Sequence, residues 1–157
     1  MSAPIATLFG IGHLRPAPGT WGSLATLPLF WATYQILGFA GVIVFTAAIF
    51  FVGWWATENY IRAAASHDPS EVVIDEVAGQ WIALLPLAFA MSFSNAHSGA
   101  LWPEWVAAFV LFRLFDITKL GPIGWADRRN DALGVMLDDC IAGIFAGTGV
   151  IIMTAIW

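Results

Sequence analysis

Three long stretches of the chain carry no charged side chain, and they cover residues 16–57, 77–103 and 140–157. A helix needs about 20 predominantly apolar residues to cross the hydrocarbon core of a bilayer, so each stretch has room for at least one crossing. Charged residues make up 11% of the 157 residues, against about 25% in a typical soluble domain. The sequence therefore predicts an integral membrane protein.

Turn residues divide the apolar stretches into five expected helices. These helices cover residues 22–37, 42–57, 76–93, 104–118 and 135–156. Gly38 and Gly41 mark the turn between the first two, because glycine readily adopts backbone conformations that end a helix. No repeat or linker divides the sequence, so residues 1–157 are expected to form one all-α domain, a bundle of about five transmembrane helices.

The basic residues all fall on one side of this five-helix arrangement. Cytoplasmic loops of membrane proteins are enriched in Lys and Arg, which predicts that this side, with the N-terminus, faces the cytoplasm. Of the eleven carboxylates, only Glu104 falls on the other side. Acidic residues follow no topological rule, so their asymmetry indicates a functional site at the cytoplasmic boundary of the membrane.

The charge balance and the small residues limit the partners. A formal net charge of −5 argues against a nucleic-acid partner, because a surface that follows phosphates needs clustered Lys and Arg in excess. Membrane lipid is the expected partner instead. Gly143 and Gly147 form a ridge of small residues that admits another helix closely, from the same chain or from a second copy, so a homo-oligomer stays open.

Five carboxylates are expected to meet at the inner ends of three helices. Asp75 and Glu76 begin the third helix, Asp116 lies near the end of the fourth, and Asp138 and Asp139 open the fifth. Helix capping is the alternative for the four acids at helix starts, because an acid there gains about 0.3 to 1 kcal/mol from the helix dipole.

A bound metal ion explains the whole cluster better than capping does. Two unit charges 4 Å apart repel by about 4 kcal/mol at an effective dielectric constant of 20, and an intramembrane Asp costs about 2.5 to 3.5 kcal/mol. Capping cannot offset several such terms at once, whereas a divalent cation can. Ligands that are all oxygen favour Mg²⁺, Mn²⁺ or Ca²⁺ over zinc, and carboxylate-held Mg²⁺ commonly serves a phosphate substrate.

Two further groups of residues are candidates for contacts with that substrate. Lys119 and Arg113 are suited to phosphate oxygens, although an ion pair with Asp116 is an equal alternative for Arg113. The glycine-rich stretch "FGIGHLRPAPGTWGSLATLPLFW" offers backbone N–H groups and the hydroxyls of Thr20 and Ser23, though Pro and Gly also mark any turn before a helix.

The chain resembles the phosphatidylglycerophosphatase A family in four blocks that follow one another in the family's order. The blocks are "PGTWGSLATLP", "HDPSEVVIDEVAGQWIALL", "FRLFDITKLGPIGWAD" and "GVMLDDCIAG". The likeness runs from about Phe9 to Gly147, which is most of the chain. It implies a Mg²⁺-dependent phosphatase that converts phosphatidylglycerophosphate to phosphatidylglycerol and phosphate at the cytoplasmic face of the bacterial inner membrane.

The resemblance also suggests roles for the site residues. The catalytic residues would be Lys119, which binds phosphate, and the five acids that supply most metal ligands: Asp75, Glu76, Asp116, Asp138 and Asp139. Whether water or a side chain attacks phosphorus stays open. The rival hypothesis is a small ion-coupled transport subunit whose carboxylates form an ion path, but transport sites lie near the bilayer midplane, and these acids gather at one boundary.

Overall fold

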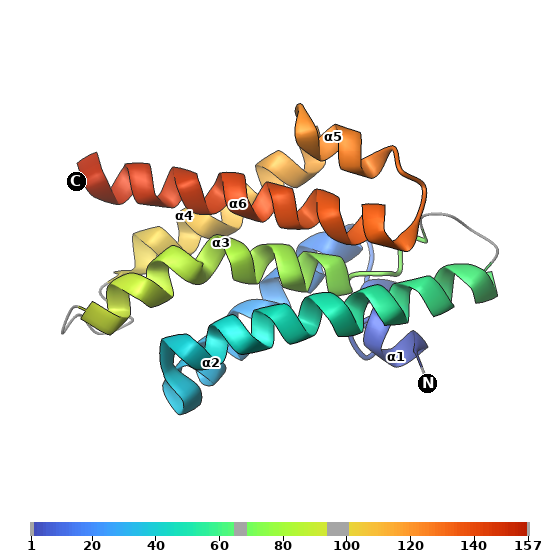
Figure 1. The fold of residues 1–157 in the computed structure, drawn as a ribbon, viewed down its shortest axis with the longest axis horizontal. Helices are drawn as coiled ribbons and strands as arrows, with labels where there is room; N and C mark the ends of the chain where they lie inside the picture. Colours follow the sequence, from blue (N-terminus) through green and yellow to red (C-terminus); the bar gives the residue numbers. More distant parts are fainter. Residues whose placement is uncertain (1, 65–68, 94–100, 157) are drawn as a thin grey trace.

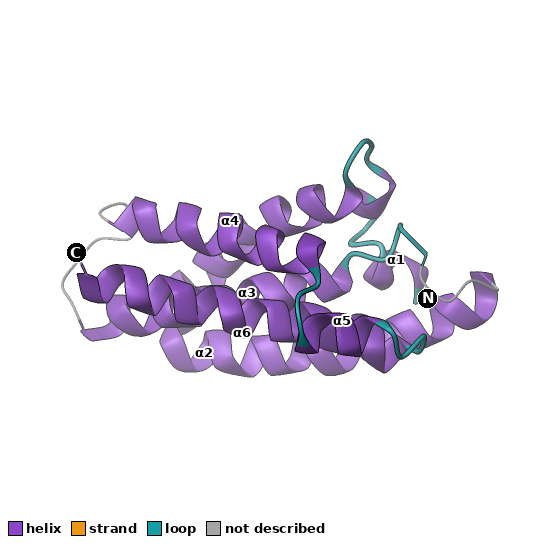
Figure 2. Ribbon diagram, turned by 90° about the horizontal axis from the view of Figure 1, so that it is seen from above, coloured by secondary structure: helices purple, strands orange, loops and turns teal. Residues whose placement is uncertain are grey.

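The computed structural model describes residues 2–64, 69–93 and 101–156, and these residues form helices and no strand (Figures 1 and 2). His67 and Asp68, which begin the second of the four sequence blocks, lie outside the described residues, as does His97. The expected all-helical fold is thus confirmed for the part of the chain described. The elements in order are α1 (Ala3–Ala6), η1 (Ile11–His13), α2 (Pro18–Ala64), α3 (Ile74–Phe93), α4 (Trp102–Thr118), α5 (Pro122–Asp127) and α6 (Ala132–Ile156).

Helix α2 contains both of the first two expected helices, folded back on each other at Gly38 (Figure 1). Gly38 has φ 66° and ψ −166°, a conformation that residues with a Cβ atom rarely adopt. The turn expected at this glycine is therefore confirmed. The second arm runs on to Ala64, beyond the expected end at residue 57.

Three of the described helices, α2, α3 and α6, are long and apolar enough to cross a membrane. Large apolar side chains are exposed on the outward faces of the bundle, as contact with lipid requires, and they include Val44, Phe51, Val110 and Ile152. Helix α4 has 17 residues, near the lower limit for a crossing. The count of about five crossings stays a prediction.

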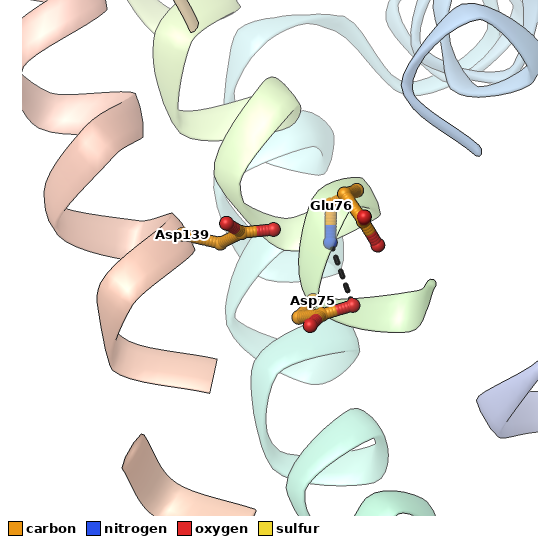
Figure 3. A group of neighbouring side chains, drawn as sticks. All are labelled: Asp75, Glu76 and Asp139. Carbon is orange, nitrogen blue, oxygen red and sulfur yellow. Dashed lines mark hydrogen bonds between the residues drawn. The ribbon is translucent and has the colours of Figure 1, made fainter. Parts of the chain in front are cut away.

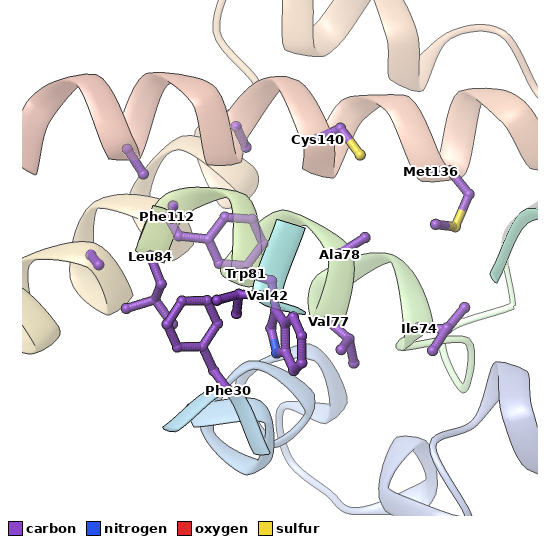
Figure 4. Packing of buried hydrophobic residues seen from close by; sticks show 14 of the residues in the cluster. Phe30, Val42, Ile74, Val77, Ala78, Trp81, Leu84, Phe112, Met136 and Cys140 are labelled. Carbon is purple, nitrogen blue, oxygen red and sulfur yellow. The ribbon is translucent and has the colours of Figure 1, made fainter. Parts of the chain in front are cut away.

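Helix α3 is the central helix, and it packs against α2, α4 and α6. Its Trp81 is buried, and the Phe30 ring of α2 meets it edge to face at a centroid distance of 5.3 Å (Figure 4). The indole N–H of Trp81 donates a hydrogen bond to the Thr26 hydroxyl, so the polar atom of this large side chain is satisfied inside the core. These contacts fix α3 against the first arm of α2.

Helices α3 and α6 run in the same direction and touch at two glycines. A Cβ atom on Gly79 would lie 2.5 Å from the Asp139 carbonyl oxygen, and one on Gly143 would lie 2.3 Å from the Gly79 carbonyl oxygen. Only glycine permits so close an approach. The partner of the Gly143–Gly147 ridge is therefore α3 of the same chain, because Gly147 faces Pro86 of α3.

We predict that Gly143→Ala destabilises the protein by about 1 to 3 kcal/mol, because the added methyl group overlaps the α3 backbone and forces the helices apart. Gly147→Ala is the matched control on the same ridge, since its Cβ would lie 3.3 Å from Pro86 Cγ, a tight contact that a small shift of the neighbour relieves. Thermal unfolding of the two purified variants measures the difference. Equal midpoints would contradict the close contact at Gly143.

Candidate active site

A cavity of about 400 Å³ opens where the starts of α2, α3 and α6 meet the ends of α4 and α5. All five acids expected from the sequence line it, together with a sixth, and two basic side chains. The acids are Asp75, Glu76, Asp116, Asp127, Asp138 and Asp139, and the bases are Arg113 and Lys119. The fold thus brings side chains from far apart in the sequence into one charged cavity in an apolar bundle.

Helix α3 contributes Asp75 and Glu76 in its first turn, as expected (Figure 3). The Glu76 backbone N–H donates to Asp75 Oδ1 at 3.0 Å, so Asp75 satisfies one of the free amides at the helix start. Glu76 does not cap in this way. Its buried Oε2 atom has no hydrogen-bond partner among the described residues. Capping therefore explains part of the role of Asp75 and leaves Glu76 unexplained.

Helix α6 begins at Ala132, three residues before its expected start, so the expectation that Asp138 and Asp139 open the helix is wrong. They are its seventh and eighth residues, beyond the four free amides that an acid can cap. Asp131 takes the capping role instead, because its Oδ1 accepts the Gly134 N–H at 2.7 Å. Capping is thereby excluded as the reason for the buried pair Asp138 and Asp139.

The carboxylate oxygens form two overlapping groups in which every member can offer one atom within 4.8 Å of the others. Asp75, Glu76 and Asp139 form one group, and Asp116, Asp138 and Asp139 form the other. Asp139 Oδ2 is buried and lacks a hydrogen-bond partner among the described residues. All-oxygen donors with orphaned buried atoms fit a hard cation such as Mg²⁺.

Arg113 joins the acids of α3 and α4. Its NH1 atom lies 2.5 Å from Asp116 Oδ2 and 3.8 Å from Glu76 Oε1. The ion pair with Asp116, one of the two alternatives from the sequence, is therefore present, and the side chain also borders the cavity. The first turn of α2 presses against this group, because a Cβ atom on Gly19 would lie 2.0 Å from Glu76 Oε1.

Lys119 joins α4, α5 and α6. It ends α4 in a left-handed conformation, with φ 47° and ψ 45°, and its Nζ donates to Asp138 Oδ2 at 3.0 Å and to Asp127 Oδ1. Partial burial lowers the pKa of Lys119, but the hydrogen bond to Asp127 and the charge of Asp138 outweigh it, so the net shift is upward. Lys119 therefore stays cationic at neutral pH.

Asp127 is a site residue that the sequence reasoning missed. It ends α5, a short helix that was not expected, and it lines the cavity. Its position at the end of the block "FRLFDITKLGPIGWAD" was a usable signal, because Asp127 follows the phosphate-binding candidate Lys119 within the same block.

Neither Thr20 nor Ser23 is among the residues that line the cavity. Ser23 is buried and its hydroxyl donates to the Gly19 carbonyl at 2.9 Å, within α2. Thr20 is half-buried. At this end of α2 the cavity is lined by Ala17, Pro18 and Gly19. The roles of Thr20 and Ser23 in substrate binding stay predictions.

Comparison with known proteins agrees with the blocks found in the sequence. Phosphatidylglycerophosphatase A of Haemophilus influenzae is 37% identical over 143 residues, which cover 90% of this chain and 82% of the relative. The Escherichia coli protein of the same name is 32% identical over 151 residues, covering 90% and 77%. A Bacteroides thetaiotaomicron protein named "Putative phosphatidylinositol-3-phosphatase" is 38% identical over 149 residues, covering 90% and 86%.

No solved structure matches the chain. The sequence model that describes phosphatidylglycerophosphatase A matches residues 4–154, which include every residue that lines the cavity. Together with the two relatives of that name, this match shows that the chain belongs to the phosphatidylglycerophosphatase A family.

Proposed function

We propose that this protein hydrolyses phosphatidylglycerophosphate to phosphatidylglycerol and phosphate, with Mg²⁺ as its cofactor. The observation that carries the proposal is the single cavity in which six carboxylates and two cationic side chains meet at one end of an apolar helical bundle. Membership of the family supplies the reaction class and the lipid. The bundle supports the membrane setting, because a lipid substrate reaches such a cavity from the bilayer.

The five acids Asp75, Glu76, Asp116, Asp138 and Asp139 would hold the metal, since their oxygens form the two close groups. When bound, Mg²⁺ would neutralise these carboxylates and polarise the phosphate of the substrate. The packing of α3 against α6 fixes the acids before substrate arrives. That rigidity favours catalysis, because ligands on packed helices need little rearrangement.

Lys119 and Arg113 would bind the phosphate oxygens. Both line the cavity, and the Lys119 side chain is 34% exposed, so its Nζ can meet a ligand while Asp127 holds it from the other side. Arg113 is more deeply buried; its NH1 atom pairs with Asp116, and its Nε atom has no hydrogen-bond partner among the described residues. Charged donors of this kind bind phosphate strongly.

The apolar surface beside the cavity fits the remainder of a phospholipid. Ile117, Leu120 and Trp125 are exposed around Lys119, on the last turn of α4, the connection and α5. Tryptophan and aliphatic side chains at such a position lie at the membrane interface, so acyl chains can stay in lipid while the phosphate enters the cavity. From the distribution of basic residues we infer that this end faces the cytoplasm, in a multi-pass topology in the inner membrane.

Phosphatidylinositol 3-phosphate is the second candidate substrate, because one relative carries a name for that activity. Both lipids present a phosphate monoester on a headgroup, which is the chemistry that the cavity fits. The ion-path alternative is not favoured, since the family and the relatives are named for phosphatases.

We predict that the purified protein releases phosphate from phosphatidylglycerophosphate with Mg²⁺ and that a chelator stops the release, because the acids need a counter-ion to bind an anionic substrate. Phosphatidylinositol 3-phosphate and phosphatidic acid, each in the same mixed micelles, are the comparison substrates. We expect kcat/KM to be highest for phosphatidylglycerophosphate. Undiminished turnover in excess chelator would refute the metal requirement, and a preference for another lipid would reassign the substrate.

We predict that Asp75→Asn and Asp139→Asn each lower kcat by at least about 100-fold, since each removes one charge that orients the metal and phosphate. Asp131→Asn is the matched control: Asp131 lies outside the cavity and pairs with the exposed Arg129, and Asn can still cap α6. Phosphate release and thermal unfolding are measured together. Near-normal turnover in both site variants would show that these acids have a structural role and are not needed for catalysis.

We predict that Lys119→Met lowers kcat/KM by about 10- to 100-fold, because a charged hydrogen bond to phosphate contributes about 1.5 to 3 kcal/mol. Arg62→Gln is the control, since it removes an exposed cation that pairs with Glu58 and does not line the cavity. Steady-state phosphate release separates the two. If kcat/KM is the same in both variants, Lys119 does not bind phosphate, and its role is limited to joining α4, α5 and α6.

A further inference from the structure

We propose that the cavity binds two divalent cations and that Asp139 is the ligand they share. The inference rests on the proposed function for the identity of the substrate, and it concerns the number of ions and the division of ligands between them. Asp75 and Glu76 belong to the first ion, and Asp116 and Asp138 belong to the second.

The arrangement of the carboxylate oxygens favours two ions over one. Asp139 is a member of both close groups, whereas the other four acids belong to one group each. A single ion accepts ligands from one compact set, so two sets that overlap at one carboxylate correspond to two neighbouring ions. Pairs of ions that act on phosphate esters lie about 3.5 to 4 Å apart, a separation that one carboxylate can bridge.

The burial of Asp139 indicates that its carboxylate binds a ligand. Asp139 is 3% exposed, and its Oδ2 atom is buried and has no hydrogen-bond partner among the described residues. Figure 3 shows its side chain extending from α6 toward Asp75 and Glu76 on α3. Glu76 Oε2 is equally buried and equally without a partner. Buried carboxylate oxygens are almost always bonded, so these two atoms point to a ligand, and a cation suits both.

The negative charge of the cavity also favours two divalent ions over one. Six carboxylates and two cationic side chains line it, so negative charges outnumber positive ones by four. One divalent cation would halve this excess, and two would remove it. A phosphate monoester carries about two negative charges at neutral pH, so a cavity with one ion would still repel its substrate. Two ions make the cavity neutral before the phosphate enters.

Arg113 lies between the two sets and keeps their separate ligands apart. Its NH1 atom contacts Asp116 Oδ2 of the second set at 2.5 Å and Glu76 Oε1 of the first at 3.8 Å. Each contact engages one oxygen of its carboxylate and leaves the other oxygen for a metal. Removal of Glu76 or Asp116 should therefore empty one site and preserve the other.

The test counts Mn²⁺ ions on the full-length protein, purified in detergent and stripped of metal. Equilibrium binding should give two Mn²⁺ per chain, and low-temperature electron paramagnetic resonance should show a spectrum of two exchange-coupled ions. Glu76→Gln and Asp116→Asn should each bind one ion with an uncoupled six-line spectrum. Asp139→Asn should lose the coupling, and the control Asp131→Asn should keep two coupled ions.

The wild-type protein alone can overturn the proposal, so a variant that fails to fold does not decide it. One Mn²⁺ per chain at saturation, or two ions without coupling, would show that Asp139 does not bridge a pair. If that protein still releases phosphate with Mg²⁺, only the two-ion inference fails. If two coupled ions bind and none of the lipid phosphates is hydrolysed, the proposed function fails and the two-ion site stands.

Discussion

The contact between α3 and α6 at Gly79 and Gly143 is the constraint on which the site depends. Side chains at these positions would overlap the facing backbone, so the glycines allow the helices to run in parallel at the closest separation that sterics permit. One turn before this contact lie Asp75 and Glu76 on one helix and Asp139 on the other. The carboxylates approach one another because the backbones behind them do, and a wider spacing would separate the two groups of metal-ligating oxygens.

Gathering so many acids at the end of an apolar bundle is unfavourable, and the remaining structure offsets part of that cost. Arg113 and Lys119, both contributed by the last turns of α4, pair with acids of α3, α5 and α6. Lys119 pairs with its acids from a left-handed conformation, which is uncommon for a residue with a Cβ atom. The two basic side chains cannot balance six carboxylates, so the helices hold an arrangement that a metal would complete.

Much of the fold followed from local rules. The charge-free stretches and the turn glycine predicted helical segments with mostly correct limits, and the spacing of Asp139, Gly143 and Gly147 predicted an inward-facing ridge. The start of α6 was misplaced because Asp131, which caps it, stands in a polar stretch without apolar periodicity. Asp127 was missed because α5 is too short to show a pattern. The function of Thr20 and Ser23 could not be judged, since a hydroxyl in a helix can bond its own backbone.

The sequence by itself determined that the chain forms apolar helices and that its four blocks resemble those of one family. These properties depend on residues close together along the chain, where hydropathy and spacing are informative. Only the tertiary structure decided which carboxylates share an oxygen cluster, which pair with Arg113 or Lys119, and that Asp139 belongs to both clusters. Those relations join α3, α4, α5 and α6, and they depend on how closely backbones pack, which no single segment specifies.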